Sequence, residues 1–379
     1  MDDENISPKF GARSLRSGFT TGACAQAAAK GSALLLLNQK MIYSVEVELP
    51  NKEMSVFTLI DQEFERDYAR CAVIKDAGDD NDITDGIKIY CEIRKSGDST
   101  IAIKGGKGVG IVTKPGLAVP VGEHAINPVP RKMIDRDVGA LLSQDVGFVV
   151  EISAPEGVAI AEKTFNPRLG IKGGISIIGT TGIVEPKSKE AYMASLALEI
   201  NVVKASDRGV VFLASGYIGE DLLKNRFGVD DGAIIKIGDH VGFMLHECVK
   251  RDIEMAVLVG HIGKLAKVAA GLFNTHSKTG DARLETIAAY AASCGASSEI
   301  VNRILGLELS EQAVEILREN NIMPAFDRIA KRVVERSVEY CRGKMKISCI
   351  ILSLNGDILG TEPLNLLESE EWKRFISLA

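Results

Sequence analysis

Alternating apolar and polar residues mark the first part of the chain. Residues 42–60 (IYSVEVELPNKEMSVFTLI) alternate on both sides of Pro50-Asn51, which predicts two strands joined as a hairpin. An Ala-rich segment, 22–37, precedes the hairpin, and its composition favours a helix that Thr20 or Thr21 caps. Many strands and few helices predict an α+β domain. Further strands are predicted by shorter alternating runs at 69–75, 87–94, 99–103 and 147–152.

Short apolar strands alternate with helical segments from about residue 208. The segments RGVVFLASG, GAIIKIGDH and EMAVLVGHIG each read as a buried strand followed by a glycine-containing turn, and a helical segment follows each one. A last apolar run at 347–355 can return to the same sheet. This alternation predicts βαβ units and a parallel α/β sheet. The change of pattern falls near 190–206, and we place the boundary between an α+β domain of residues 1–195 and an α/β domain of residues 196–379.

Composition and charge narrow the class of protein. The length of 379 residues fits two domains, or three, of about 150 residues each. Hydrophobic residues make up 46%, as in folded proteins, and the formal net charge of −6 lacks the basic excess that nucleic acid or an anionic membrane selects. The seven cysteines are scattered without a CxxC pair, and the five histidines show no HxH or HExxH spacing. We therefore expect no disulfide framework and no protein-built metal site, and a reducing cytoplasm fits the chain.

The turn after the first strand of the α/β domain is a candidate cofactor site. Ser215, Gly216 and Gly219 lie there, at the carboxyl end of the strand, where doubly wound sheets bind ligands. Asp239 ends the next strand about twenty residues later, a spacing at which an acidic residue can bind a ribose diol. This spacing occurs both in dinucleotide enzymes and in S-adenosylmethionine (SAM) methyltransferases, and the missing GxGxxG triplet argues against a pyrophosphate. A purely structural glycine turn is the alternative.

Two further polar segments are expected at the same sheet edge. His261 and Lys264 follow the third strand. His261 lies between two glycines and Lys264 directly follows the second of them, and a helix-capping role is as plausible here as a functional one. Asp281 ends the polar stretch NTHSKTGD at 274–281, which reads either as part of the cleft or as a solvated loop.

The α+β domain offers groups suited to an anionic ligand. Thr20 and Thr21 open the Ala-rich helix, and a helix N-terminus binds carboxylates or phosphates readily. Cys24 lies in its first turn, where a lowered thiol pKa and a small buried thiol are both open. Lys107 lies in the glycine-rich segment 104–110, either an anion-binding nest or a glycine hairpin, while Arg168 and Lys172 lie in a second such loop. These cations and donors suit a ligand with several carboxylates.

An ordered set of motifs then resembles a known family. In chain order these motifs are SGFTTGACAQAAAKG, GGKGVGIVTKPGL, AINPVPRKMI, NPRLGIKGGISIIGTTGIVEP, SGYIG, VGHIGK and THSKTGDAR. Each motif alone is weak, but together they resemble the CbiD family, cobalt-precorrin-5B C(1)-methyltransferases of the anaerobic route to cobalamin. The resemblance covers essentially the whole chain. Two positions depart from the family pattern. Family members often carry Thr or Ser where this chain has Ala23, and often carry Thr where it has Ser17.

The resemblance implies a SAM-dependent methyl transfer to C-1 of a cobalt-containing tetrapyrrole, giving cobalt-precorrin-6A. It also implies that the α/β domain is Rossmann-like and that cobalt enters only with the substrate. The macrocycle carbon is the nucleophile, so catalysis rests mainly on proximity and alignment. SAM is then expected at Ser215, Gly216, Gly219 and Asp239. The corrinoid is expected at Thr20, Thr21, Lys107, Arg168 and Lys172.

Some expectations stay open on the sequence. His261 is our first candidate for a general acid or base and Asp281 the second. The expected partner is the small-molecule corrinoid, without nucleic acid or membrane, and a homo-oligomer is open. Two other functions remain: a nucleotide- or NAD-dependent enzyme of another class, and a non-catalytic tetrapyrrole carrier.

Overall fold

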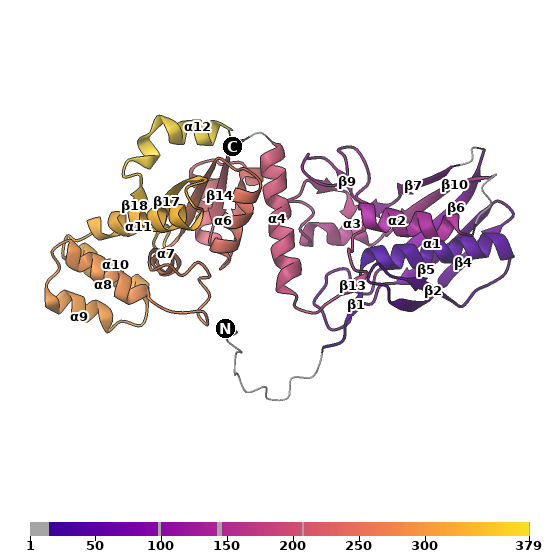
Figure 1. Cartoon of the computed structure of the whole chain (residues 1–379), viewed down its shortest axis with the longest axis horizontal. Coiled ribbons are helices and arrows are strands. Elements are labelled where there is room, and N and C mark those ends of the chain that lie inside the picture. Colours follow the sequence, from indigo (N-terminus) through magenta and orange to yellow (C-terminus); the bar gives the residue numbers. More distant parts are fainter. Residues whose placement is uncertain (1–14, 98–99, 142–145, 207, 379) are drawn as a thin grey trace. The chain divides into compact units, whose positions relative to one another are not determined.

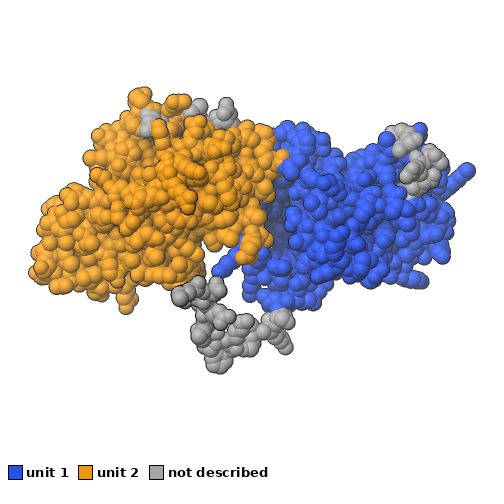
Figure 2. Space-filling view, in the orientation of Figure 1, with its two compact units in different colours: residues 1–114, 118–189 blue, residues 115–117, 190–379 orange. Residues whose placement is uncertain are grey.

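Two five-stranded sheets organise the computed structural model, which describes residues 15–97, 100–141, 146–206 and 208–378. Each sheet belongs to its own compact unit (Figure 2). The first unit runs to Lys114 and resumes over Ala118–Lys189, and the second comprises Pro115–Leu117 and the chain from Glu190 onward. Position 195, where we placed the domain boundary, lies inside helix α4 (Lys189–Ala205). Within the described ranges, no helix combines the length and apolar character needed to cross a membrane.

The sheet of the first unit has the strand order β4-β5-β6-β10-β7. Neighbouring strands are antiparallel except β10 and β7, which are parallel. Apolar residues alternate along β6 and β10 between buried and less buried positions, as the sequence predicts for strands with one face on the core. The strands span Ile60–Glu65 (β4), Tyr68–Ile74 (β5), Lys88–Ser96 (β6), Ile101–Gly105 (β7) and Gly147–Ser153 (β10).

Helix α1 (Thr21–Asn38) lies over this sheet, with α2 (Pro128–Gly139) beside it (Figure 1). The alanines and glycines of α1 are buried, because small side chains allow the helix axis to approach the strands closely. At Gly31 an added Cβ would lie 2.7 Å from Leu59 Cδ1. The buried Ser32 hydroxyl accepts from Cys71 N at 3.1 Å and donates to Cys91 O at 2.8 Å, so it bridges β5 and β6.

Short paired segments complete the first unit. The predicted hairpin is confirmed as β2 and β3, which pair in antiparallel register around the Pro50-Asn51 turn. Two glycine-rich loops meet, because β8 pairs with β12 and β9 pairs with β11. The segments are β1 (Gly18–Phe19), β2 (Ser44–Glu48), β3 (Met54–Thr58), β8 (Gly108–Val109), β9 (Ile111–Val112), α3 (Gly157–Ile160), η1 (Ala161–Lys163), β11 (Ile171–Lys172), β12 (Gly174–Ile175) and β13 (Ile183–Val184).

The second unit carries the predicted parallel sheet, in the order β15-β14-β16-β17-β18. All neighbours are parallel except β18, an antiparallel edge strand. β14 and β16 are buried along nearly their whole length, which explains their continuous apolar runs. On one face Phe212 packs edge-on against Trp372 of the C-terminal helix, with ring centroids 5.8 Å apart. The strands span Val210–Ala214 (β14), Ile234–Lys236 (β15), Met255–His261 (β16), Lys346–Leu352 (β17) and Ile358–Glu362 (β18).

Helices connect these strands and cover the sheet, as Figure 1 shows. Helix α11 packs along β17 and β18 and against α7. The helical segments are α5 (Tyr217–Asp221), η2 (Leu222–Arg226), η3 (Asp231–Ala233), α6 (Val241–Lys250), α7 (Ile262–Ala269), α8 (Arg283–Ser293), α9 (Ser298–Leu305), α10 (Ser310–Glu319), α11 (Pro324–Tyr340), η4 (Leu366–Glu368) and α12 (Glu370–Leu378).

Candidate functional site

The strand order of the parallel sheet reverses direction beside β14. The chain leaves β14 to form β15 on one side, then returns to form β16 on the other side of β14. At such a reversal the loops after the two central strands diverge and leave room for a ligand at their carboxyl ends. Ser215 and Gly216 follow β14, His261 ends β16, and Asp239 follows β15. The fold therefore brings these predicted residues to one edge.

Ser215 carries a buried hydroxyl with no hydrogen-bond partner. The residue is 3% exposed, and its N–H donates to Val259 O at 2.8 Å, which continues the ladder between β14 and β16. Its Oγ is buried and unpartnered. A Cβ added to Gly260 would lie 1.9 Å from this Oγ, so the hydroxyl fills space that only a glycine leaves. An unpaired buried hydroxyl costs about 1–3 kcal/mol, which a bound ligand or water can recover.

The two glycines of the first turn have different surroundings. At Gly216 an added Cβ would meet nothing within 4 Å, which leaves the backbone open to a ligand. At Gly219 it would lie 3.0 Å from Val259 O, so this glycine lets α5 approach β16. Between them Tyr217 is 77% exposed, with Lys236 Nζ 3.9 Å from its ring centroid.

Asp239 is held as a carboxylate beside a threonine and a lysine. Its Oδ1 accepts from Thr275 Oγ1 at 2.9 Å and lies 3.3 Å from Lys264 Nζ. Burial raises the pKa of this carboxyl, but the hydrogen bond from Thr275 and the charges of Lys264 and His276 together lower it by more. The pKa therefore lies below its ordinary value. Asp239 can therefore accept hydrogen bonds from a ligand at neutral pH.

His261 caps helix α7. Its Nδ1 accepts from Gly263 N at 3.0 Å, which puts the ring proton on Nε2. Nε2 lies 2.9 Å from Glu311 Oε2, and both oxygens of Glu311 also accept from Leu354 N. Both ring nitrogens are thus engaged, so proton exchange with a substrate requires one of these two bonds to open.

Asp281 forms a two-bond fork with Arg283. Its Oδ1 accepts from Arg283 Nε at 2.8 Å, and its Oδ2 accepts from Nη2 at 2.6 Å. Because these hydrogen bonds lower the pKa of Asp281 to about 2, it has no proton to donate at neutral pH. The general acid or base assigned to His261 or Asp281 stays a prediction.

The threonines at the start of α1 have partners within the protein. Thr20 Oγ1 accepts from Ala23 N at 3.2 Å, as a helix cap does. Thr21 Oγ1 donates to Ser176 O at 3.0 Å and accepts from Ile178 N at 2.9 Å, and the residue is buried. A ligand at either hydroxyl must replace or share these bonds. Substrate binding by Thr20 and Thr21 remains a prediction.

Cys24 is a buried thiol, so the lowered pKa that we left open is wrong. Burial raises the pKa of the Cys24 thiol to about 12, although the nearby Lys75 ammonium lowers it in part.

The two glycine-rich loops pack backbone against backbone. A Cβ on Gly174 would lie 2.2 Å from Gly108 O. The N–H groups of Gly106 and Gly110 donate to Ile152 O and Ile175 O, so these donors are not free for an anion. The exposed groups left near the loops are side chains.

Those side chains include the predicted cations. Lys107 directly precedes β8, and Lys172 ends β11. Both are exposed, and neither side chain has a hydrogen-bond or ion-pair partner in the part of the chain that the structure describes. Arg168 is half-buried in the loop before β11. Lys107 and Lys172 are therefore available to a carboxylate.

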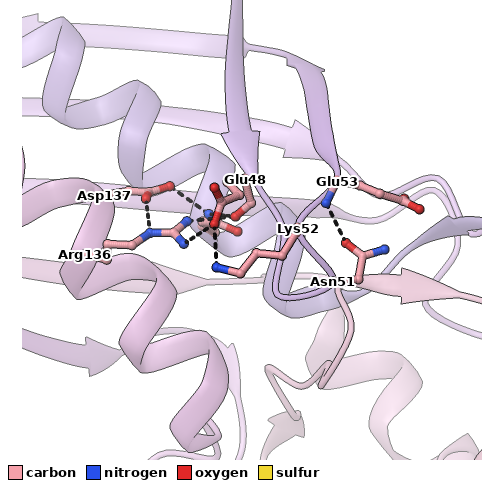
Figure 3. Close-up of polar contacts among 7 residues, drawn as sticks. Glu48, Asn51, Lys52, Glu53, Arg136 and Asp137 are labelled. Atoms are coloured by element: carbon pink, nitrogen blue, oxygen red, sulfur yellow. Dashed lines mark hydrogen bonds and ion pairs between the residues drawn. The ribbon is translucent and has the colours of Figure 1, made fainter.

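A polar cluster outside the predicted sites fastens the β2–β3 hairpin to α2 (Figure 3). Arg136 Nη2 donates to Glu48 O at 2.7 Å, and its Nε donates to Asp137 Oδ1 at 2.8 Å. Lys52 Nζ lies 3.0 Å from Glu48 Oε1, and the fully buried Gln26 donates to Asp137 Oδ2 at 2.7 Å. The charged groups of the cluster pair with one another or with neighbouring groups of the protein, which indicates a structural role.

Sequence reasoning missed three residues at the sheet edge: Lys267, Thr275 and Glu311. Thr275 lay in a segment considered only as a whole, and Glu311 lies fifty residues from the histidine it contacts. A helical spacing of three from Lys264 was a usable signal for Lys267. Within the described ranges, no three His, Cys, Asp or Glu side chains gather so that they could hold a metal ion.

Comparisons with known proteins cover both units. A family model described as "CbiD" matches residues 9–186, and one described as "CbiD, C-terminal domain" matches residues 274–363. The chain is 42% identical, over 92% of each chain, to cobalt-precorrin-5B C(1)-methyltransferase of Alkaliphilus metalliredigens. It is 43% identical to the enzyme of the same name from Moorella thermoacetica, over 94% of this chain and 98% of that one.

A solved structure is also similar. It is the 1.9 Å crystal structure of cobalamin biosynthesis protein (cbiD) from Archaeoglobus fulgidus, at 29% identity. The match covers 72% of this chain and 84% of that chain, with a TM-score of 0.38.

Proposed function

The chain belongs to the CbiD family, and on that premise we propose that it is a SAM-dependent methyltransferase that methylates C-1 of cobalt-precorrin-5B to give cobalt-precorrin-6A in anaerobic cobalamin biosynthesis. Support comes from relatives that carry this enzyme name and align over more than nine-tenths of the chain. The corrinoid brings its cobalt with it, as part of the substrate.

The cofactor proposal rests on one observation, the buried and unpartnered Ser215 hydroxyl at the carboxyl end of β14, where the strand order reverses. Asp239 follows the neighbouring strand β15 and is held as a carboxylate, the group that suits a ribose diol. Gly216 leaves its backbone open beside them. These residues fit a nucleoside, and the 2-1-3-4 order of the parallel strands supports the view that the second unit is Rossmann-like.

When bound, SAM supplies an electrophilic methyl group on a sulfonium centre. The residues of the chain then act by holding and aligning, because the nucleophilic carbon belongs to the macrocycle. Ser215 would donate a hydrogen bond, Gly216 would allow close backbone approach, and Asp239 would accept from the ribose. Gly219 supports this turn from behind by allowing α5 to pack on β16.

The carboxylate arms of the corrinoid would bind to cations of the first unit. Lys107 and Lys172 support this assignment because they are exposed and their ammonium groups lack protein partners in the described ranges. Arg168, half-buried nearby, offers the planar fork that suits carboxylates. Thr20 and Thr21 would take part only by sharing hydroxyls that already have partners.

Proton transfer, if the ring requires it, would use His261. The Glu311 carboxylate fixes its tautomer, and opening the bond between Nδ1 and Gly263 N would expose the basic nitrogen. Asp281 is the second candidate, restricted to accepting protons by its pKa of about 2.

Calorimetric titration with SAM tests the cofactor site. Because a hydrogen bond to a charged group contributes about 1.5–3 kcal/mol, Asp239→Asn should weaken SAM binding about tenfold or more. Glu254→Gln is the matched control, since Glu254 is an exposed acid at the amino end of β16. Unchanged SAM affinity in Asp239→Asn would show the ribose assignment to be wrong. Titration with NAD and ATP separates the nucleotide-dependent alternative.

A further inference from the structure

A chain of hydrogen bonds leads from a buried lysine to Asp239. Lys267, on α7, is 4% exposed, and its Nζ donates to Thr275 O at 3.2 Å. Thr275, itself 4% exposed, donates through its N–H to Asp239 O at 3.0 Å and through its Oγ1 to Asp239 Oδ1 at 2.9 Å. Thr275 thus forms hydrogen bonds with both the backbone and the side chain of Asp239.

The ammonium of Lys267 is unusual for its burial. It forms no ion pair within the described ranges, although buried ammonium groups are normally paired. Its one hydrogen bond goes to the carbonyl of Thr275. This contact joins α7 to the start of the 274–281 loop, and the charge of Lys267 also acts on Asp281 at the end of that loop, whose pKa it helps to lower.

The contacts divide the two carboxylate oxygens of Asp239. Oδ1 accepts from Thr275 and lies 3.3 Å from Lys264 Nζ, which fills its acceptor capacity. Oδ2 has no hydrogen-bond partner in the described part of the chain, and the Asp239 side chain is 31% exposed. The carboxylate is therefore held in one rotamer with a single oxygen free.

We propose that Thr275 and Lys267 are positioning residues for the nucleoside: they hold Asp239 so that its Oδ2 alone accepts a hydrogen bond from a ribose hydroxyl. The proposal rests on the proposed function, because it takes the nucleoside of SAM as the ligand. Thr275 does not touch the ligand and acts through Asp239. Lys267 acts one step further back, through the carbonyl of Thr275.

The probe is S-adenosylhomocysteine, titrated calorimetrically into the full chain. Thr275→Val keeps the shape and the backbone bonds but loses the hydroxyl donor, and we expect affinity to fall about tenfold, as for loss of a hydrogen bond to a charged group. Thr275→Ser restores the donor and should return affinity to within about twofold of the wild type. Circular dichroism melting of each variant establishes that it folds.

A double-mutant cycle separates positioning from a general structural effect. If Thr275 acts through Asp239, Thr275→Val should cost little in an Asp239→Asn background. Full additivity of the two losses, or wild-type affinity in Thr275→Val, would overturn the proposal. Lys267→Met should also weaken binding, whereas Lys278→Met, an exposed lysine of the same loop, should not.

Failure of the proposed function gives a different result. A wild-type chain that binds NAD or ATP but not S-adenosylhomocysteine refutes SAM as cofactor, and the same variants then test positioning with the nucleotide that binds. A wild-type chain that binds none of the three overturns both.

Discussion

Single residues at the sheet edge are constrained by space as much as by chemistry. Ser215 Oγ occupies the volume that a Cβ of residue 260 would take, at 1.9 Å. Ser215 directly follows β14, and Gly260 lies on the neighbouring strand β16. Glycine at 260 is therefore required by the serine opposite it, the residue that we propose contacts the nucleoside.

Substitution at 260 should reveal this coupling. Gly260→Ala should lower the free energy of unfolding by about 1–3 kcal/mol, because the added methyl overpacks a buried site. In the double variant Ser215→Ala/Gly260→Ala the nearest atom becomes Ser215 Cβ at 3.2 Å, so most of that loss should be recovered. Urea titrations of both single variants and the double variant measure the effect. Losses that simply add would refute the steric coupling.

Helix starts, at the next scale, serve two purposes in this chain. Thr20 and His261 were predicted from the sequence as binding and catalytic residues. In the structure, each side chain accepts a hydrogen bond from a backbone N–H in the first turn of its helix, Ala23 N for Thr20 and Gly263 N for His261. A residue pattern at a helix start cannot separate the two roles, because capping and anion binding use the same N–H groups.

A buried hydroxyl of helix α1 hydrogen-bonds to two strands of its sheet. Ser32 supplies both a donor for Cys91 O and an acceptor for Cys71 N, groups of neighbouring strands. Ser32→Ala removes both hydrogen bonds from a buried site, so we expect a loss of about 1–3 kcal/mol in the free energy of unfolding.

Urea unfolding measures this loss, with Ser44→Ala as the control. Ser44 is exposed on β2 of the same unit, and its replacement should change the free energy by less than about 0.5 kcal/mol. Equal effects of the two substitutions would contradict the bridging role of Ser32.

The whole molecule combines two architectures, and local sequence pattern predicted both. Continuous apolar runs gave the parallel sheet because its strands are buried on both faces, and alternation gave the β2–β3 hairpin. The pairing of β8 with β12 could not be predicted, because two-residue glycine segments carry no periodicity and their partners lie far apart in the sequence. The antiparallel edge strand β18 was missed for its brevity and its glycine.

The candidate site was predicted in part for the same reason. Strand ends are local signals, so Ser215, Gly216 and Asp239 could be placed at one edge before the structure was known. Burial and hydrogen bonds join distant segments, so the unpartnered hydroxyl of Ser215 and the bond from Thr275 to Asp239 appear only in the fold.

The net negative charge of the whole molecule means that local cations must account for binding of an anionic corrinoid. A chain of net charge −6 opposes a ligand with many carboxylates, so specific cations must hold it. Lys107 and Lys172, which we propose bind these carboxylates, are exposed, whereas the nearby amides of Gly106 and Gly110 donate to backbone carbonyls.

Methyl transfer itself tests the central claim most directly. The full chain is incubated with cobalt-precorrin-5B and SAM carrying an isotopically labelled methyl group, and the corrinoid is analysed by mass spectrometry. The account predicts a gain of one labelled methyl group at C-1, with S-adenosylhomocysteine formed in equal amount. A corrinoid that binds to the chain but is recovered without label would contradict the account and leave a tetrapyrrole carrier in its place.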